Sequence, residues 1–185
     1  MSGDKIALLR PMQADLEELE QFFTRCIHSV LIDEGLKDIE AFVTDEVSEK
    51  MKFVQSDLDS EGRTYFFLLA KKDQKIIGTI AYGPAGALIN ELSKGVYSTY
   101  GEIGSVFVHP DQHNRGIGSS MLNAMYLVLL GRGVKTFTLD SGYTKAKKIW
   151  TGKLGNPDII VKDYWGEGYD HYIWCRSMDE VSIAF

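Results

Sequence analysis

The segment best suited to chemistry runs from Val106 to Ser119, where an apolar strand pattern gives way to a polar loop and then to a helical pattern. Loops at the carboxyl ends of strands are where mixed sheets bind ligands. The predicted helix begins near Gly116, and its first N–H groups have no intrahelical partners and lie at the positive end of the helix dipole. Together these properties predict an anion site, for which a diphosphate is a natural ligand.

The residue types in this loop fit that prediction. Gly116 and Gly118 remove side chains where an anion would approach the backbone, and Arg115 adds a fixed charge with planar donors. The alternative is a plain loop in which the glycines only turn the chain. Two other phosphate motifs are excluded: a dinucleotide fingerprint needs a third glycine near Met121, and a P-loop needs Gly-Lys-Ser/Thr, and the sequence has neither.

Composition narrows the class of protein. The 185 residues are predicted to form one domain, 1–185, and the net charge of −6 argues against nucleic acid as a partner and mildly favours a cationic one. The sequence shows no apolar run long enough for a membrane span and no secretory signal, which predicts a cytoplasmic protein without membrane contact. Cys26 and Cys175 are interpreted as reduced thiols, and His109 and His113, which flank a proline, are not predicted to bind a metal.

Hydrophobic periodicity predicts an early hairpin and a late strand-helix-strand crossover, and therefore a mixed sheet with helices on its faces, an α/β (α+β mixed) fold. Thr44 is the expected N-cap of the second helix. The predicted strands cover 5–9, 64–70, 75–82, 97–108, 134–140, 159–161 and 171–176, the helices cover 15–26, 44–58, 116–130 and 145–154, and 83–95 is predicted to be a turn-rich loop.

The central segment resembles the GNAT superfamily of N-acetyltransferases. The signature of that family is a strand ending in Val-x-Pro, then Q/R-x-x-G-x-G/A, then a helix. The chain has Val108-His109-Pro110 followed by His113-Asn114-Arg115-Gly116-Ile117-Gly118, and the only departure is His113, at a position that acts mainly through its backbone. The first strand and helix and the hairpin of residues 66–82 also resemble the family, whereas residues 146–155 match its late helix less well.

The resemblance implies a mixed, mostly antiparallel seven-stranded sheet, flanked by about four helices and splayed between its fourth and fifth strands. It implies that acetyl-CoA lies in that gap, that its pantetheine pairs with the backbone of Val106 and Val108, and that no metal takes part. The implied cofactor-binding residues are Val106, Phe107, Val108, His113, Asn114, Arg115, Gly116, Ile117, Gly118 and Ser119.

An amine must be neutral before it attacks a thioester, so the reaction calls for a base. Glu102 precedes the central motif, aligns with the glutamate base of the histone-acetylating branch of the family, and is predicted to share a strand face with Val106. The alternative is a solvated glutamate at the start of the strand. Tyr143 and Thr151 are candidates to protonate the departing thiolate, and the backbone N–H of Val108 is the implied oxyanion donor.

The expected acceptor is a primary amine, of a small molecule rather than of a protein, and a homodimer is compatible with the sequence. The aromatic and acidic segment Tyr164–His171 is interpreted as a hairpin turn with core aromatics, and alternatively as a wall of the amine pocket, with Glu167 or Asp170 meeting a cation that Trp165 stacks on. Two other functions remain open: a non-catalytic acyl-CoA-binding or sensing module, and a protein-interaction role for the aromatic tail.

Overall fold

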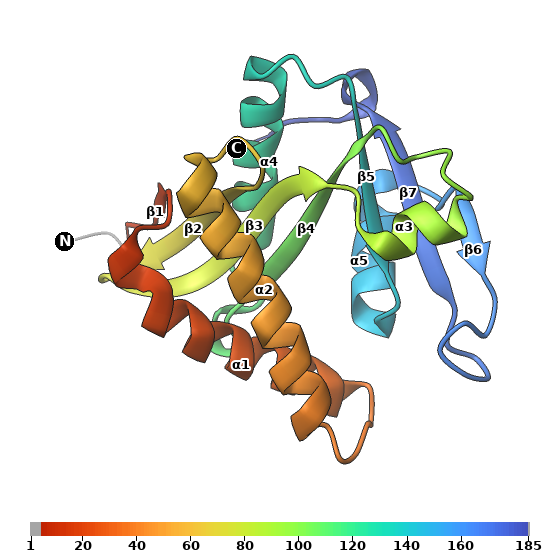
Figure 1. Cartoon of the computed structure of the whole chain (residues 1–185), viewed down its shortest axis with the longest axis horizontal. Helices are drawn as coiled ribbons and strands as arrows, with labels where there is room; N and C mark the ends of the chain where they lie inside the picture. The colour runs from red at the N-terminus through yellow and green to blue at the C-terminus, as the bar shows by residue number, and fades with distance from the viewer. Residues whose placement is uncertain (1–4, 185) are drawn as a thin grey trace. The chain divides into compact units, whose positions relative to one another are not determined.

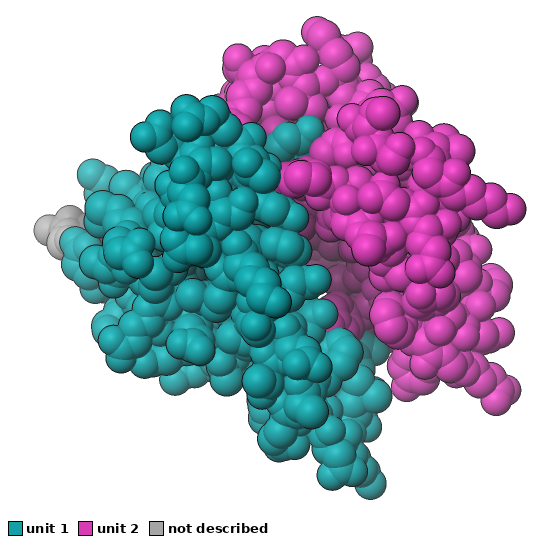
Figure 2. Space-filling model, viewed as in Figure 1, with its two compact units in different colours: residues 1–82, 105–125, 185 teal, residues 83–104, 126–184 magenta. Residues whose placement is uncertain are grey.

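The computed structural model describes residues 5–184, which form two compact units. In the described part of the chain, unit 1 comprises 5–82 and 105–125, and unit 2 comprises 83–104 and 126–184 (Figure 2). Seven strands form one sheet in the order β1-β2-β3-β4-β5-β7-β6 (Figure 1). The strands are β1 Ala7–Leu9, β2 Phe66–Lys72, β3 Lys75–Pro84, β4 Gly101–Val108, β5 Thr136–Ser141, β6 Ile159–Val161 and β7 His171–Ser177.

Unit 1 contains the antiparallel strands β1, β2 and most of β3, with the helices α1, Leu16–Asp33, and α2, Glu40–Ser60. The two helices pack against each other, as Figure 1 also shows. Residues of α1 at helical spacing point into the core because a helix buries one stripe of its surface. The buried stripe of α1 consists of Leu19, Phe22, Phe23, Cys26, Ile27 and Leu31.

Asp57, near the end of α2, forms an ion pair with Arg10, just after β1, and a hydrogen bond with the start of β2. The Asp57 side chain is fully buried, and its carboxylate accepts hydrogen bonds from the Arg10 guanidinium and, at 2.6 Å, from the backbone N–H of Phe67. The guanidinium also lies 4.2 Å from the centre of the Phe66 ring. A Cβ at Gly62, where φ is +79°, would come within 2.5 Å of the Arg10 guanidinium.

Gly62→Ala is therefore expected to lower the free energy of unfolding more than Gly35→Ala. Both positions have a positive φ, so backbone strain should lower the free energy of unfolding of each variant by roughly 1–2 kcal/mol. Only at Gly62 does the new methyl group meet other atoms, which should cost about 1–3 kcal/mol more by overpacking. Urea unfolding of the two variants measures the difference, and equal losses would show that the Arg10 contact does not constrain the fold.

Unit 2 is built on β5, β7 and β6, which pair antiparallel, and on α5, Thr144–Leu154. Alternate residues of β5 face opposite sides of the sheet. On one side, Phe137 packs against Tyr126 of α4, Ile117–Gly131, and the Trp174 indole N–H donates to the carbonyl of Gly155 at the end of α5. This side is the covered core of unit 2, and the opposite side of β5 carries Thr138 and Asp140.

The predicted strands and helices are present, with four corrections. The first helix, predicted to end at Cys26, continues to Asp33. A fifth helix, α3 at Ala87–Leu92, lies in the predicted loop and buries Ile89. The second helix begins at Glu40, so Thr44 is not its cap; its hydroxyl donates to the Glu40 carbonyl one turn earlier, an alternative bond open to threonine inside helices. The fourth strand begins at Gly101, because the residues before it form turns.

The parallel register of β4 with β5 covers only Gly101 and Glu102, paired with Phe137 and Thr138. The register thus ends six residues before the end of β4. Within residues 5–184, no helix combines the length and the apolar composition that a membrane crossing requires.

Candidate functional site

The predicted anion loop of unit 1 connects β4 to α4 through a 3-10 turn at Pro110–Gln112. Asn114 and Gly116 both have a left-handed backbone, with φ of 61° and 76°. Left-handed residues that alternate with ordinary ones turn successive N–H groups toward one point and form a concave anion site. The first turn of α4 follows at once, so the loop ends at the positive end of the helix dipole.

The side chain of His113, the departure from the family signature, has a structural role. Its Nε2 lies 2.9 Å from the carbonyl oxygen of Val108, and because a carbonyl only accepts, Nε2 carries the hydrogen. The Cys26 thiol of α1 donates to the same carbonyl at 3.8 Å. Burial, partly opposed by the charge of Arg25, raises the pKa of Cys26 to about 12, so this thiol stays protonated. These contacts fix the end of β4 relative to the loop.

Gly116 and Gly118 of the loop differ in what the fold requires of them. A Cβ at Gly116 would meet nothing within 4 Å, but the positive φ there disfavours any other residue. At Gly118, a Cβ would touch only Val108 Cγ2, at 3.7 Å, an ordinary contact distance. The fold therefore needs the backbone freedom of Gly116, whereas nothing in the fold requires glycine at 118.

β4 is irregular in its middle, at Ser105. Ser105 has a φ of 48°, and its carbonyl accepts a hydrogen bond from the Thr79 hydroxyl of β3 at 2.8 Å. A left-handed residue interrupts the alternation of side chains along a strand. The prediction that Glu102 and Val106 share one face assumed unbroken alternation between them, and the structure does not provide it.

Glu102 is half-buried in unit 2, and a backbone N–H binds its carboxylate. Oε2 accepts the N–H of Gly86, just before α3, at 2.7 Å. A Cβ at Gly104 would lie 3.0 Å from Oε1, and one at Gly86 would lie 3.1 Å from Oε2. The two glycines leave room for the carboxylate, which is therefore an oriented group and not a freely solvated charge.

Tyr143, the candidate acid, also belongs to unit 2. It is the N-cap of α5, partly exposed, and its backbone N–H donates to the Ser141 hydroxyl at 3.2 Å. Thr151 lies within α5, where its carbonyl accepts the N–H of Gly155. The predicted cofactor residues are thus contiguous in unit 1, and both predicted catalytic residues lie in unit 2.

The segment Tyr164–His171 forms the predicted turn between β6 and β7, but its aromatics are not all in the core. Trp165 is 54% exposed and Tyr169 is 42% exposed, which corrects the interpretation as core aromatics. Sequence reasoning also missed the pairing of Asp140 with His171, whose Nε2 lies 3.1 Å from Asp140 Oδ2. The available signal was the position of Asp140 near the carboxyl end of β5. Within residues 5–184 the His, Cys, Asp and Glu side chains form no group of three or more suited to a metal.

Comparison with known proteins identifies relatives of this fold. One similar solved structure is the PaiA N-acetyltransferase of Thermoplasma acidophilum with coenzyme A, at 16% sequence identity and a TM-score of 0.67, over 94% of this chain and 99% of that one. A second is YncA of Salmonella typhimurium with its cofactor acetyl-CoA, at 14% identity and a TM-score of 0.66, over 98% of each chain. A third is the ribosomal-protein-S18-alanine N-acetyltransferase of Escherichia coli, at 15% identity and a TM-score of 0.61, over 98% of this chain and 99% of that one. At these identities the likeness shows the fold. A search of curated proteins gives no match. The model of the Acetyltransferase (GNAT) family matches residues 27–155, more than half of the chain, and the chain therefore belongs to this family.

Proposed function

We propose that this chain is an acetyl-CoA-dependent N-acetyltransferase that transfers an acetyl group to the primary amine of a small molecule, with residues 1–185 acting as one catalytic domain. The observation that carries the proposal is the backbone of residues 114–119, where two left-handed residues, Asn114 and Gly116, lead into the N-terminus of α4. The family match supports it, as do the solved relatives whose structures hold coenzyme A or acetyl-CoA.

The loop fits a diphosphate in both shape and charge. N–H groups of the residues from Asn114 to Ser119 would hold the phosphate oxygens, and Arg115 would add a cation. A Cβ at Gly116 would meet nothing within 4 Å and one at Gly118 would touch only Val108, so a ligand can approach the backbone at both glycines. Val106, Phe107 and Val108 would pair with the pantetheine arm as a peptide pairs with a strand edge.

The proposed role of Glu102 is to take a proton from the acceptor amine, directly or through a water molecule. The neutral nitrogen then attacks the acetyl carbonyl carbon, a C–N bond forms and the C–S bond breaks, and the surplus proton of the attacking nitrogen restores the one that Tyr143 gives up. The N–H of Val108 would stabilise the charge on the carbonyl oxygen, and Tyr143 would return a proton to the departing thiolate. The fixed position of the Glu102 carboxylate supports this assignment, because a base must be held within reach of the proton it removes.

Acetyl-CoA is expected to stabilise the fold. At a concentration of 100 times its Kd it should add roughly 2.7 kcal/mol to the free energy of unfolding. Thermal unfolding with acetyl-CoA, with adenosine as the control, measures this, and an absence of any shift with acetyl-CoA would contradict the proposal. Release of free thiol on addition of pooled amines then tests transfer. Stabilisation without thiol release would instead support the non-catalytic binding module.

A further inference from the structure

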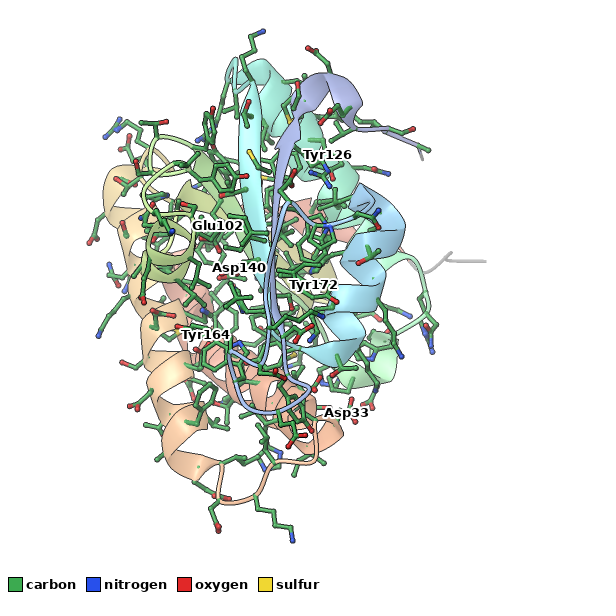
Figure 3. The ribbon with its side chains drawn as sticks, turned by 90° about the vertical axis from the view of Figure 1, so that its right-hand side faces the viewer. Asp33, Glu102, Tyr126, Asp140, Tyr164 and Tyr172 are labelled. Atoms are coloured by element: carbon green, nitrogen blue, oxygen red, sulfur yellow. The ribbon has the colours of Figure 1, made fainter. Side chains whose placement is uncertain are left out.

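The clearest unexplained constellation lies in unit 2, on the side of β5 opposite to its covered core. Two residues that are in register on neighbouring strands, parallel or antiparallel, place their side chains on the same face of the sheet. Glu102 is in register with Thr138, and Asp140, two residues further along β5, is in register with Ile173 of β7. His171 lies two residues before Ile173, so the carboxylates and the imidazole share one face. In Figure 3, Glu102 and Asp140 lie on one side of β5, and Tyr126 and Tyr172 lie on the other.

The hydrogen bonds define the protonation of His171. The Trp165 indole N–H lies 3.1 Å from His171 Nδ1, and because an indole N–H can only donate, Nδ1 must be the acceptor. The hydrogen of the neutral imidazole is then on Nε2, where it donates to Asp140 Oδ2 at 3.1 Å. Trp165 is itself held against the backbone of Gly142, where a Cβ would come within 2.5 Å of the indole nitrogen.

In this chain of contacts the accessible charged group is the Asp140 carboxylate. The side chain of His171 is only 3% exposed and both of its nitrogens are engaged, so it cannot meet a ligand directly. The Asp140 side chain is 21% exposed, and no lysine or arginine among residues 5–184 lies within 4.0 Å of it. His171 is therefore a positioning residue: its hydrogen bond orients the Asp140 carboxylate without neutralising its charge.

The acidic groups of the neighbouring hairpin are less suited to meeting a ligand. Asp170 Oδ2 accepts from Lys162 at 2.7 Å and its Oδ1 accepts from the Asp163 N–H at 3.0 Å. These hydrogen bonds, that of Lys162 first, lower the pKa of Asp170 and occupy both of its oxygens. Asp140 is the carboxylate on the Glu102 face whose charge has no cation beside it in the described structure.

We infer that Asp140 binds a second, protonated amino group of the acceptor, so that the preferred substrate is a diamine or longer polyamine; this inference rests on the proposed acetyl transfer. With strands about 4.8 Å apart and a rise of about 3.3 Å per residue, the Cα atoms of Glu102 and Asp140 are about 8 Å apart. Two carboxylates at that spacing suit two amino groups joined by a short carbon chain. The amine near Glu102 loses its proton and reacts, and the distal ammonium stays charged at Asp140.

The test compares putrescine, a four-carbon diamine, with butylamine, which lacks its second amino group. In the parent protein, kcat/KM is expected to be about 10- to 100-fold higher for putrescine, the effect of one charge-assisted hydrogen bond. Asp140→Asn should abolish this preference by lowering kcat/KM for putrescine to the level of butylamine. Trp165→Phe, which removes the donor to His171, should reduce the preference in part, and this variant keeps the test open if Asp140→Asn does not fold.

Glu167→Gln is the matched control, because it removes one negative charge from an exposed position of the same hairpin. It should keep the full preference, which separates local binding from long-range steering. Calorimetric binding of both amines to the CoA-loaded protein gives a readout independent of transfer. A binding preference that depends on Asp140, without acetylation of either amine, would support this inference and refute the proposed function. No preference in the parent, or an undiminished one in Asp140→Asn, would overturn the inference.

Discussion

Glu102→Gln is expected to lower the rate of acetyl transfer by about 10²- to 10⁴-fold while the affinity for acetyl-CoA stays the same. Glutamine keeps an oxygen that can accept the Gly86 N–H, now 2.7 Å from the carboxylate, so the geometry should persist while the base is lost. The rate should recover in part at high pH, because the amine then loses its proton to solvent. Initial rates measured across pH, with saturating acetyl-CoA, give both the loss and the recovery.

Gly104→Ala provides a second variant that leaves the carboxylate chemically intact. Its Cβ would lie 3.0 Å from Glu102 Oε1, which must then shift by a few tenths of an ångström. A smaller rate loss of up to about tenfold is expected, since small displacements of a reacting group are costly. Full activity of Glu102→Gln at neutral pH would show that solvent removes the proton, and a loss without recovery at high pH would assign Glu102 to substrate orientation.

Gly118→Val is expected to weaken acetyl-CoA binding by about 100-fold or more, the loss of two charge-assisted hydrogen bonds of roughly 1.5–3 kcal/mol each. Gly118 is the second residue of α4, and its Cβ position contacts only Val108 Cγ2 at 3.7 Å. The branched side chain should therefore block the diphosphate and leave the fold intact. Titration calorimetry with acetyl-CoA measures the affinity, and thermal unfolding without ligand measures the fold.

Gly131→Val makes the same chemical change at the other end of the same helix, where a Cβ meets nothing within 4 Å. This variant should bind acetyl-CoA as the parent does and controls for the effect of a β-branched residue on helix stability. If Gly118→Val also binds like the parent, the loop after β4 does not hold the diphosphate, whatever the role of Glu102.

The sequence alone predicted most of the strands and helices and the loop before α4. Apolar and aromatic runs between turn residues predicted the seven strands, helical patterns predicted α1, α2, α4 and α5, and the two glycines after Val108 predicted the loop that leads into α4. Each of these signals lies within a few consecutive residues, where backbone propensity and burial act together. The short helix α3 was missed because it has six residues among turn formers, too few for periodicity to emerge.

The arrangement of the residues around Glu102 and Asp140 came only from the tertiary structure. The left-handed Ser105 lies in an apolar strand pattern that predicts regular alternation, and its conformation accompanies a hydrogen bond to Thr79 of the neighbouring strand. Glu102 is oriented by Gly86, 16 residues away, and Asp140 by His171, 31 residues away. Sequence supplied these carboxylates and the imidazole; the register of β4, β5 and β7 placed them on one face, because register follows from side-chain packing over the whole sheet and is not encoded in any single strand.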